Sequence, residues 1–182
     1  TQEGLYRHYK AVADAVKIPI VLYNVPGRTA VNMLPTTVAR LAEIKNIVAI
    51  KEATGDMKQV SEVIRLCGDK ITVISGDDFT TIPLMALGGK GVISVAANVA
   101  PKLVAQMCAL WEQGKYDEAR KIHFHLEPLN AAMFIETNPI PAKTALAMMG
   151  KIKEEFRLPL CEMSTANRDK LKGVLKGMKL IR

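Results

Sequence analysis

The chain has 182 residues, 49% of them hydrophobic and 24% charged, which is ordinary composition for a globular domain of moderate size. Its longest apolar stretches, IPIVLY and GVISVAANVA, fall well short of the about 20 residues that span a bilayer. The amino-terminal TQEGLYRHYK has no charged-then-apolar signal pattern. We therefore expect a cytoplasmic protein with no membrane partner. The chain does not start with methionine, which leaves open that it begins within a longer gene product.

The net charge of +7 comes largely from basic residues near the end of the chain, namely Lys170, Lys172, Lys176, Lys179 and Arg182. A basic helix can contact nucleic acid, but no aromatic residues are interleaved with these lysines. We expect a solvated helix face and no nucleic-acid partner. The cysteines are odd in number and scattered, which favours reduced thiols over a disulfide framework; they are Cys67, Cys108 and Cys161.

The hydrophobic pattern alternates between helical and strand periods along the first part of the chain. Residues 2–16 place apolar side chains on one helical face, and IPIVLY at 18–23 is a continuous apolar run. Further helices are predicted where the helical period returns, at 34–44, 56–68 and 78–89, and further strands at 46–53, 71–76 and 91–98. Asp56 and Gly68 fit the N-cap and the end of the helix between them.

Only helical patterns follow this alternating part, at 100–113, 116–136, 139–149 and 164–178. Strands that are apolar on both faces and separated by helices predict a parallel sheet covered by helices, so the fold class is α/β. We divide the chain into four βα units at 1–113 and a C-terminal helical region at 114–182.

Four strands cannot close a (β/α)8 barrel, which typically needs about 250 residues. The pattern alone therefore leaves two alternatives, a small open α/β domain or the second part of a barrel. No GxGxxG or GxxxxGK[ST] motif is present, so nucleotide-binding folds lose support. The chemically distinctive residues fall at the carboxyl ends of the predicted strands, where α/β folds place their sites. These residues are Tyr23, Lys51, Gly76, Asp77 and Asn98.

Lys51 ends a strand among Ala49, Ile50 and Ala53, and partial desolvation there is expected to lower the pKa of its amine. A neutral amine can attack a ketone to form a Schiff base, which then acts as an electron sink for a carbanion. The alternative is a packed stem whose head pairs with Glu52 or another acid. This stretch taken alone favours the alternative.

Tyr23 occupies the equivalent end of the preceding strand. Because neighbouring parallel strands lie about 4.8 Å apart, Tyr23 and Lys51 could share one site, where a phenol can relay protons. A core tyrosine with a satisfied hydroxyl is the alternative. Arg28 follows across a tight turn and suits bidentate binding of a carboxylate, with an ordinary surface arginine as its alternative.

Other polar residues give weaker signals. In SGDD at 75–78, Asp77 or Asp78 is predicted to cap the next helix. His123 and His125 lie two apart on a predicted helix and face different directions, so we expect no metal site. No serine stands in a GxSxG motif, which disfavours a serine hydrolase.

Five motifs together resemble one known family. They are LYNVPGRT at 22–29, IKEATGD at 50–56, SGDD at 75–78, GGKGVISVAANVAP at 88–101 and ETNPIPAKTAL at 136–146. Each motif alone would be a weak signal, but all five match the order and spacing of the dihydrodipicolinate synthase family. This family belongs to the pyruvate-dependent class I aldolase superfamily, and the resemblance runs the whole length of the chain.

The resemblance implies a (β/α)8 TIM barrel with a C-terminal helical region, usually assembled as a homotetramer. It implies a lyase that condenses pyruvate with L-aspartate 4-semialdehyde to give 4-hydroxy-tetrahydrodipicolinate, in diaminopimelate and lysine biosynthesis. The resemblance implies no cofactor beyond the covalent imine that pyruvate forms on the enzyme.

The resemblance also implies a role for each matching residue. Lys51 matches the lysine that forms the Schiff base with pyruvate, and Tyr23 matches the tyrosine that transfers protons beside it. Arg28 matches the arginine that helps to bind the carboxylate of the aldehyde. Ile93 matches a position whose backbone contacts pyruvate, and Gly76–Asp77 line the aldehyde side.

The family's first half carries features that this sequence lacks. They are a TTGE-type loop that binds the pyruvate carboxylate and supplies a relay threonine, a tyrosine contributed across the dimer interface, and the lysine feedback site. We therefore expect the chain to correspond to strands five to eight plus the tail. We expect it to be inactive without a partner, the N-terminal half of the same barrel.

Two alternatives remain at this point. N-acetylneuraminate lyase and keto-deoxy sugar acid aldolases share the tyrosine and the lysine, but PGRT with Arg28 favours a small carboxylated aldehyde over a sugar. A non-catalytic homologue is the other alternative. It is disfavoured because folding requires none of the three residues Lys51, Tyr23 and Arg28.

Overall fold

A computed structural model describes all residues, 1–182, and divides them into two compact units, Thr1–Ile93 and Ser94–Arg182. The boundary predicted from the sequence, between residues 113 and 114, separates the four expected βα units from the helical region rather than two packing units. It stays a prediction. Each unit is described by itself below.

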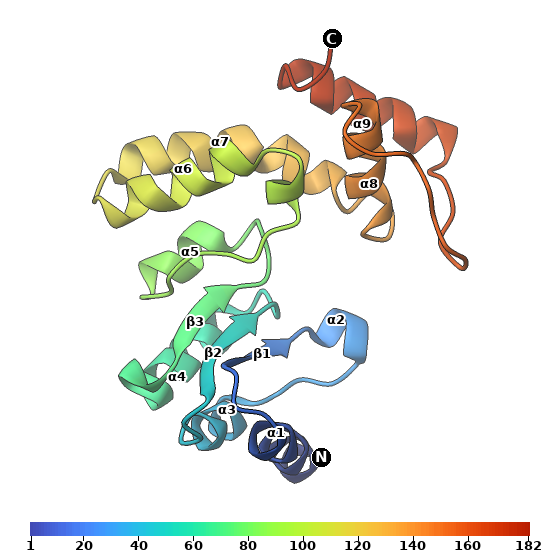
Figure 1. Ribbon diagram of the computed structural model, residues 1–182. Helices are drawn as coiled ribbons and strands as arrows, with labels where there is room; N and C mark the ends of the chain where they lie inside the picture. Colours follow the sequence, from blue (N-terminus) through green and yellow to red (C-terminus); the bar gives the residue numbers. More distant parts are fainter. The chain divides into compact units, whose positions relative to one another are not determined.

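The first unit alternates helices and strands in the predicted order (Figure 1). Its elements are α1 (Gln2–Ala15), β1 (Ile20–Asn24), α2 (Pro26–Thr29), α3 (Pro35–Leu41), β2 (Ile47–Glu52), α4 (Met57–Cys67), the 3-10 helix η1 (Gly68–Lys70), β3 (Thr72–Ser75) and α5 (Thr81–Ala86). The short helix α2 stands where the sequence predicts only a tight turn, and Pro26 fits its first position because proline presets the helical φ.

The three strands form one parallel sheet in the order β1-β2-β3, which confirms the predicted α/β class with a parallel sheet and helices. At the carboxyl end, Tyr23 pairs with Lys51, and Lys51 pairs with Ile74. One residue further on, Asn24 pairs with Glu52. In-register residues of parallel strands point to the same face, so these two rows lie on opposite faces of the sheet.

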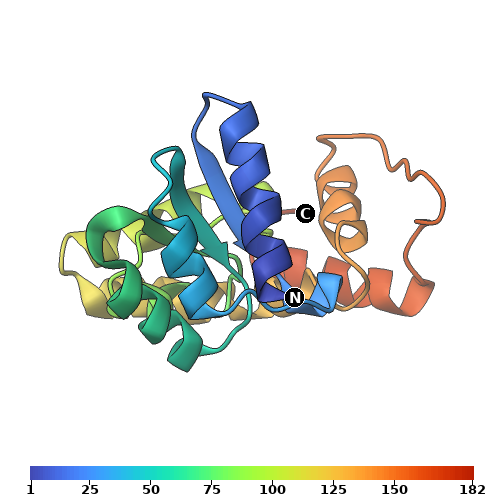
Figure 2. The ribbon, with the colours of Figure 1, turned by 90° about the horizontal axis from the view of Figure 1, so that it is seen from below.

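The core of this unit lies between the sheet and its helices. Leu22, Ile50 and Val73 point from the three strands into one buried cluster, which also contains residues of α1, α3 and α4. Figure 2 shows these helices beside the strands. Burying a leucine or isoleucine side chain stabilises the fold by roughly 1.5–3 kcal/mol. A strand shifted by one residue would lose this burial, so the apolar cluster determines which side chains of each strand point inward.

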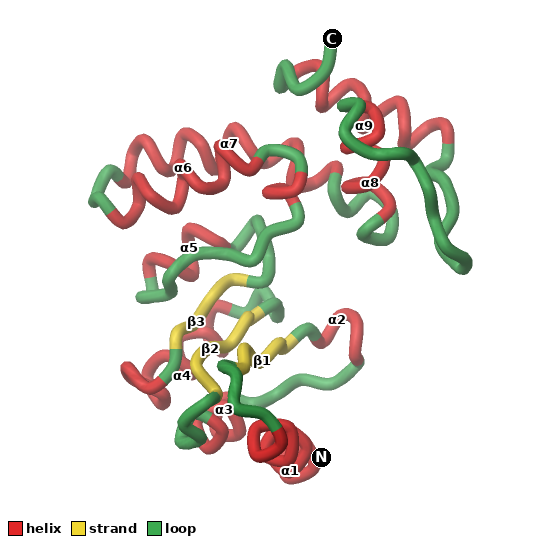
Figure 3. Tube along the Cα trace, in the orientation of Figure 1, coloured by secondary structure: helices red, strands yellow, loops and turns green.

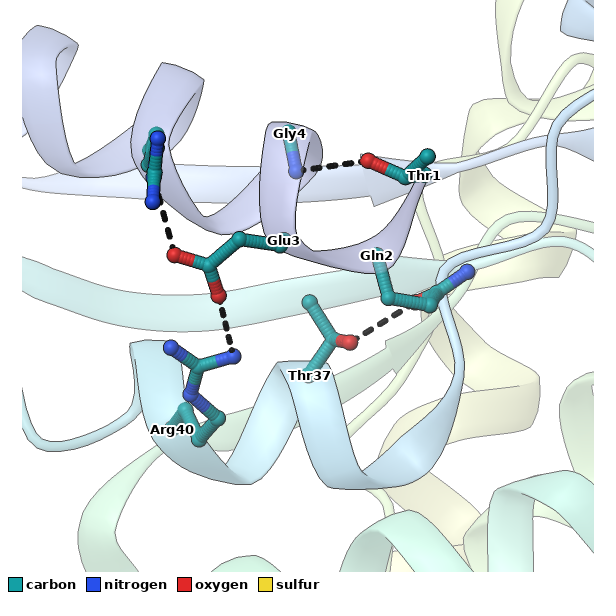
Figure 4. A network of polar contacts seen from close by, with 7 residues as sticks. Thr1, Gln2, Glu3, Gly4, Thr37 and Arg40 are labelled. Carbon is teal, nitrogen blue, oxygen red and sulfur yellow. Dashed lines mark hydrogen bonds and ion pairs between the residues drawn. The ribbon is translucent and has the colours of Figure 1, made fainter.

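Helix α1 is held to α3 by polar contacts as well as by the core (Figure 4). The Glu3 carboxylate accepts hydrogen bonds from Arg40 at 3.0 Å and from Arg7 at 2.9 Å. The Thr37 hydroxyl donates to Gln2 Oε1 at 2.7 Å. These bonds orient α1 against α3, and Gln2 Nε2 also donates to the carbonyl of Asn32 at 2.8 Å.

Both predicted ends of α4 are confirmed. The Asp56 side chain accepts hydrogen bonds from the backbone N–H groups of Lys58 and Gln59, so it is the N-cap. Gly68 ends the helix with a φ of 55°, a conformation that costs a side-chain-bearing residue free energy.

Two local predictions are wrong. The strand expected at 91–98 is reduced to an isolated parallel bridge between Val92 and Ser75. Residues Ala96–Asn98 instead form the 3-10 helix η2, because the Ser94 hydroxyl accepts a hydrogen bond from Ala97 N–H and closes a local turn.

The predicted capping of α5 by an aspartate is the second error. Thr80 occupies the N-cap position, so neither Asp77 nor Asp78 stands there. Asp77 instead accepts a hydrogen bond from Phe79 N–H at 3.4 Å, within the turn that precedes the helix.

The second unit is helical (Figure 3). After η2 it contains α6 (Pro101–Glu112), α7 (Tyr116–Ala132), α8 (Ile140–Met148) and α9 (Thr165–Gly177), close to the predicted ranges. Helices α6 and α7 lie side by side, and buried leucines such as Leu126, Leu129, Leu171 and Leu175 form much of the packing. The lysines of the last segment are exposed, as expected for a solvated face. None of the helices is long and apolar enough to cross a membrane.

Candidate active site

The carboxyl ends of β1 and β2 bring Tyr23 and Lys51 together, as the sequence predicts. The two residues are paired in register, and the Lys51 Nζ atom lies 4.1 Å from the centre of the Tyr23 ring. An amine over the face of an aromatic ring is attracted by the ring quadrupole when it is charged. This contact keeps the amine beside the phenol.

The structure fits neither simpler alternative, a core tyrosine at position 23 or a lysine at position 51 that is paired with an acid. Tyr23 is 42% exposed, so it is not a core tyrosine. Lys51 is half-buried and makes no ion pair, and the neighbouring Glu52 carboxylate points to the opposite face of the sheet. The Lys51 amine therefore stays available for chemistry.

Gly76 follows β3 and lies directly against the Lys51 stem. A Cβ atom at position 76 would be 3.1 Å from both Cγ and Cε of Lys51, and 2.6 Å from the Ala53 Cβ. Contacts this short require the surroundings to shift. The glycine therefore leaves the space that the lysine side chain fills.

The turn after Gly76 is anchored by a buried serine. The Ser75 hydroxyl donates to the Asp77 carbonyl at 2.7 Å, and Asp77 N–H donates back to the same hydroxyl oxygen at 3.2 Å. Burial raises the pKa of the Asp77 carboxyl, with the neighbouring Asp78 adding to this effect and the Phe79 N–H opposing it. The turn thus presents a carboxyl group whose pKa lies above its ordinary value.

Two further predicted residues lie at the same end of the sheet. Ile93 N–H donates to the Ser75 carbonyl at 2.9 Å, which holds the Ile93 backbone next to β3. Arg28 is exposed on α2, beyond the end of β1 (Figure 1), and makes no ion pair. The predicted residues therefore gather at one end of the sheet, but no hydrogen bond or cation–π contact joins Arg28 to Tyr23 or Lys51.

A buried polar network behind this site was not predicted. The Glu52 carboxylate accepts hydrogen bonds from Asn24 Nδ2 and Gln59 Nε2 on the face opposite Lys51. Strand alternation contains the signal, since Asn24 and Glu52 are polar residues at positions that should point into the apolar core. The helix residue Gln59 carries no comparable signal.

The arrangement defines a class of α/β proteins, in which a lysine amine and a phenol share the carboxyl end of a parallel sheet. The sequence profile of the Dihydrodipicolinate synthetase family matches residues 1–178. The chain belongs to this family.

Individual relatives are similar along the entire chain. The 4-hydroxy-tetrahydrodipicolinate synthase of Thermodesulfovibrio yellowstonii is 71% identical over 182 residues, which are 100% of this chain and 62% of that protein. The crystal structure of dihydrodipicolinate synthase from Aquifex aeolicus matches with a TM-score of 0.97 at 51% identity, covering 99% of this chain and 62% of that one. The chloride-inhibited enzyme from Acinetobacter baumannii, complexed with pyruvate, matches with a TM-score of 0.96 at 46% identity, covering 100% and 62%. The chain thus spans 62% of the length of these relatives.

Proposed function

We propose that the protein containing this chain condenses pyruvate with L-aspartate 4-semialdehyde to give 4-hydroxy-tetrahydrodipicolinate, through a Schiff base on Lys51. The observation that carries the proposal is the Lys51 amine, unpaired and held over the ring of Tyr23 at 4.1 Å. Membership of the family and the pyruvate complex of the Acinetobacter baumannii relative support the same substrate.

In the proposed reaction the neutral Lys51 amine attacks the ketone carbon of pyruvate, and the resulting carbinolamine loses water to form an imine. The imine withdraws electrons from the neighbouring methyl carbon, which loses a proton to give an enamine. The enamine then attacks the aldehyde carbon of the second substrate, which gives an alkoxide that takes up a proton and restores the imine on Lys51. The amino group of the second substrate then attacks the imine carbon and displaces the Lys51 amine, which closes the ring and frees the lysine. Each of the first two steps moves a proton, and the Tyr23 phenol beside the amine is the proposed relay.

The remaining site residues are proposed to hold the substrates. Arg28 would bind the carboxylate of the aldehyde bidentately, which its exposed position on α2 permits. Ile93 would contact pyruvate through its carbonyl oxygen, since its N–H is already donated to Ser75. Gly76–Asp77 would line the aldehyde side of the site.

We also propose that β1, β2, β3 and the bridge at Val92 occupy strand positions five to eight of a (β/α)8 barrel. The other strand positions would lie in the part of the relatives' length that this chain does not cover, together with the groups that bind the pyruvate carboxylate. On this proposal residues 1–182 alone do not turn over substrate. The complete protein would assemble as a homotetramer.

The proposal is tested by trapping the imine with borohydride and mapping the adduct. The joined enzyme for this test carries the uncovered part of the Thermodesulfovibrio yellowstonii relative ahead of Thr1. Incubation with pyruvate and borohydride is expected to add one reduced pyruvate to the peptide that contains Lys51. Lys51→Ala is expected to abolish the adduct and to leave the circular dichroism spectrum unchanged.

Two outcomes would contradict the proposal. An adduct that persists in Lys51→Ala would place the nucleophile elsewhere, and no adduct on a folded joined enzyme would exclude Schiff-base chemistry. Turnover is then compared between aspartate semialdehyde and the aldehyde partners of sugar-acid aldolases. A preference for a sugar aldehyde would assign the chain to another pyruvate-dependent aldolase.

A further inference from the structure

The sheet face opposite Tyr23 and Lys51 is apolar except at its carboxyl end. Four polar side chains meet there, and we call them the strand-end network: Asn24, Asn32, Glu52 and Gln59. Three of the four are almost fully buried, and Glu52 is only 2% exposed. The network joins β1, β2, the first turn of α4 and the segment that follows α2.

Glu52 is the acceptor at the centre of this network. Its Oε2 atom accepts hydrogen bonds from Asn24 Nδ2 at 3.1 Å and from Gln59 Nε2 at 3.5 Å. Its Oε1 atom accepts one from Thr54 N–H at 2.8 Å. All three of these hydrogen bonds come from N–H donors, which suits a carboxylate because it can only accept.

The backbone of Met33 fixes which way the two amides point. Met33 N–H must donate, so the Asn24 Oδ1 atom that accepts from it at 3.0 Å is an oxygen. The Met33 carbonyl must accept, so the Gln59 atom that contacts it at 3.3 Å is the Nε2 nitrogen. Both amides therefore present their NH2 groups to Glu52, and a neutral amide at position 52 could not satisfy the same donors.

Glu52 is buried without an ion-pair partner, a placement that does not favour stability over an apolar side chain of similar size. Its position next to Lys51 suggests another use. We propose that Glu52 is a positioning residue that holds Tyr23 and Lys51 together, an inference that rests on the proposed Schiff-base function.

The link acts through the alternation of the strands. Asn24 directly follows Tyr23 and Glu52 directly follows Lys51, so the Asn24–Glu52 hydrogen bond on the buried face mirrors the Tyr23–Lys51 contact on the other. The same network fixes both ends of the segment 25–31, which carries α2. Loss of the acceptor would let the strand ends separate and displace the phenol from the amine.

The test compares variants of the joined enzyme in the borohydride assay, over a range of pyruvate concentrations. Glu52→Gln replaces the acceptor without changing its size, and Glu52→Asp keeps a carboxylate. Asn46→Leu is the control, because Asn46 lies just before β2, at the amino end of the sheet, and donates hydrogen bonds in the same unit to the Ala13 and Val16 carbonyls. Thermal unfolding of each variant measures the loss of stability.

We expect Glu52→Gln to lower the maximal trapping rate by about tenfold or more, since small misplacements of reacting groups are costly. The half-saturating pyruvate concentration should change much less, because the network does not touch the substrate. Glu52→Asp should recover part of the rate, and Asn46→Leu should trap at the parent rate even where it lowers stability. If Glu52→Gln does not fold, Gln59→Met, which removes one donor from outside the sheet, is expected to slow trapping instead.

Unchanged trapping by a folded Glu52→Gln or Gln59→Met variant would overturn the inference. An equal fall in Asn46→Leu would also overturn it, since the effect would then follow stability alone. If the parent enzyme forms no adduct, the proposed function fails and this inference fails with it. The two failures are distinguishable, because a failure of the proposed function shows as a missing adduct in the parent enzyme. A failure of this inference alone leaves the parent adduct intact and shows only in the variants.

Discussion

At the scale of single residues, the site depends on what lies immediately beside Lys51. Tyr23 borders its amine on one side, and Gly76 borders its stem on the other. The lysine side chain is long and has several rotatable bonds, so its amine is placed only if neighbours restrict it. Gly76 and the Tyr23 ring therefore both restrict where the Lys51 side chain can lie.

Gly76→Ala is expected to slow imine trapping by roughly tenfold or more, because the new Cβ would push the Lys51 stem away from Tyr23. The measurement is the rate of adduct formation in the joined enzyme, with circular dichroism to show that the variant folds. Gly173→Ala is the control, since a Cβ there meets nothing within 4 Å and α9 favours alanine. Equal rates for the two variants would show that the glycine does not place the lysine.

At the scale of elements, the last two helices are joined by acidic side chains rather than by direct packing alone. Glu154 accepts hydrogen bonds from Thr144 of α8, at 2.9 Å, and from Arg168 of α9. Glu136, before α8, accepts three hydrogen bonds from Ser164 and Asn167 at the start of α9. Both carboxylates therefore tie α9 to the rest of the second unit.

These bonds predict a loss of stability in acid. Arg168 lowers the pKa of Glu154 below its ordinary value of 4.5, with a smaller contribution from Thr144. The unfolded chain therefore binds the proton more readily, so the contribution is complete above about pH 4.5 and is lost as the pH falls through the lower folded value. Glu154→Gln should flatten this part of the dependence of unfolding free energy on pH, measured by denaturant titration. An unchanged slope in the variant would assign the acid sensitivity to other carboxylates.

At the scale of the whole molecule, one face of the sheet in the first unit remains largely exposed. Apolar side chains lie on it or beside it, including Val21 at 45%, Tyr23 at 42% and Ile93 at 46% exposed. β1 is also an edge strand with backbone groups left for further pairing, whereas the outer edge of β3 is bonded to residues 90–93. Both features fit the proposal that further barrel strands pair with this sheet.

Residues 1–182 alone are expected to form no borohydride-trapped adduct, whereas the joined enzyme forms one on Lys51. The physical reason is that the lysine lacks the groups proposed to bind the pyruvate carboxylate. Mass spectrometry of both proteins after identical treatment makes the comparison, with size-exclusion chromatography to detect association. Equal trapping by the shorter chain would show that these 182 residues hold pyruvate without further strands.

The sequence predicted much of this arrangement because local patterns control it. The alternation of helical and strand periods gave the order of elements, and Asp56 and Gly68 marked the ends of α4. The strand predicted at 91–98 is wrong because the Ser94 hydroxyl favours a local turn, which the apolar pattern of this stretch does not reveal. The five motifs likewise predicted the family, and the match of the family's sequence profile to residues 1–178 confirmed it.

By itself, then, the sequence determined the parallel α/β class and the positions of Tyr23 and Lys51 at strand ends, since periodicity and chain order are local properties. Tertiary structure decided the register that pairs these residues and the close fit of Gly76 against the lysine. It also decided the convergence of Asn24 and Glu52 with a helix residue, Gln59, which is distant from Asn24 in the chain. These features depend on which surfaces pack together, and packing is set by side chains that no single stretch of sequence contains.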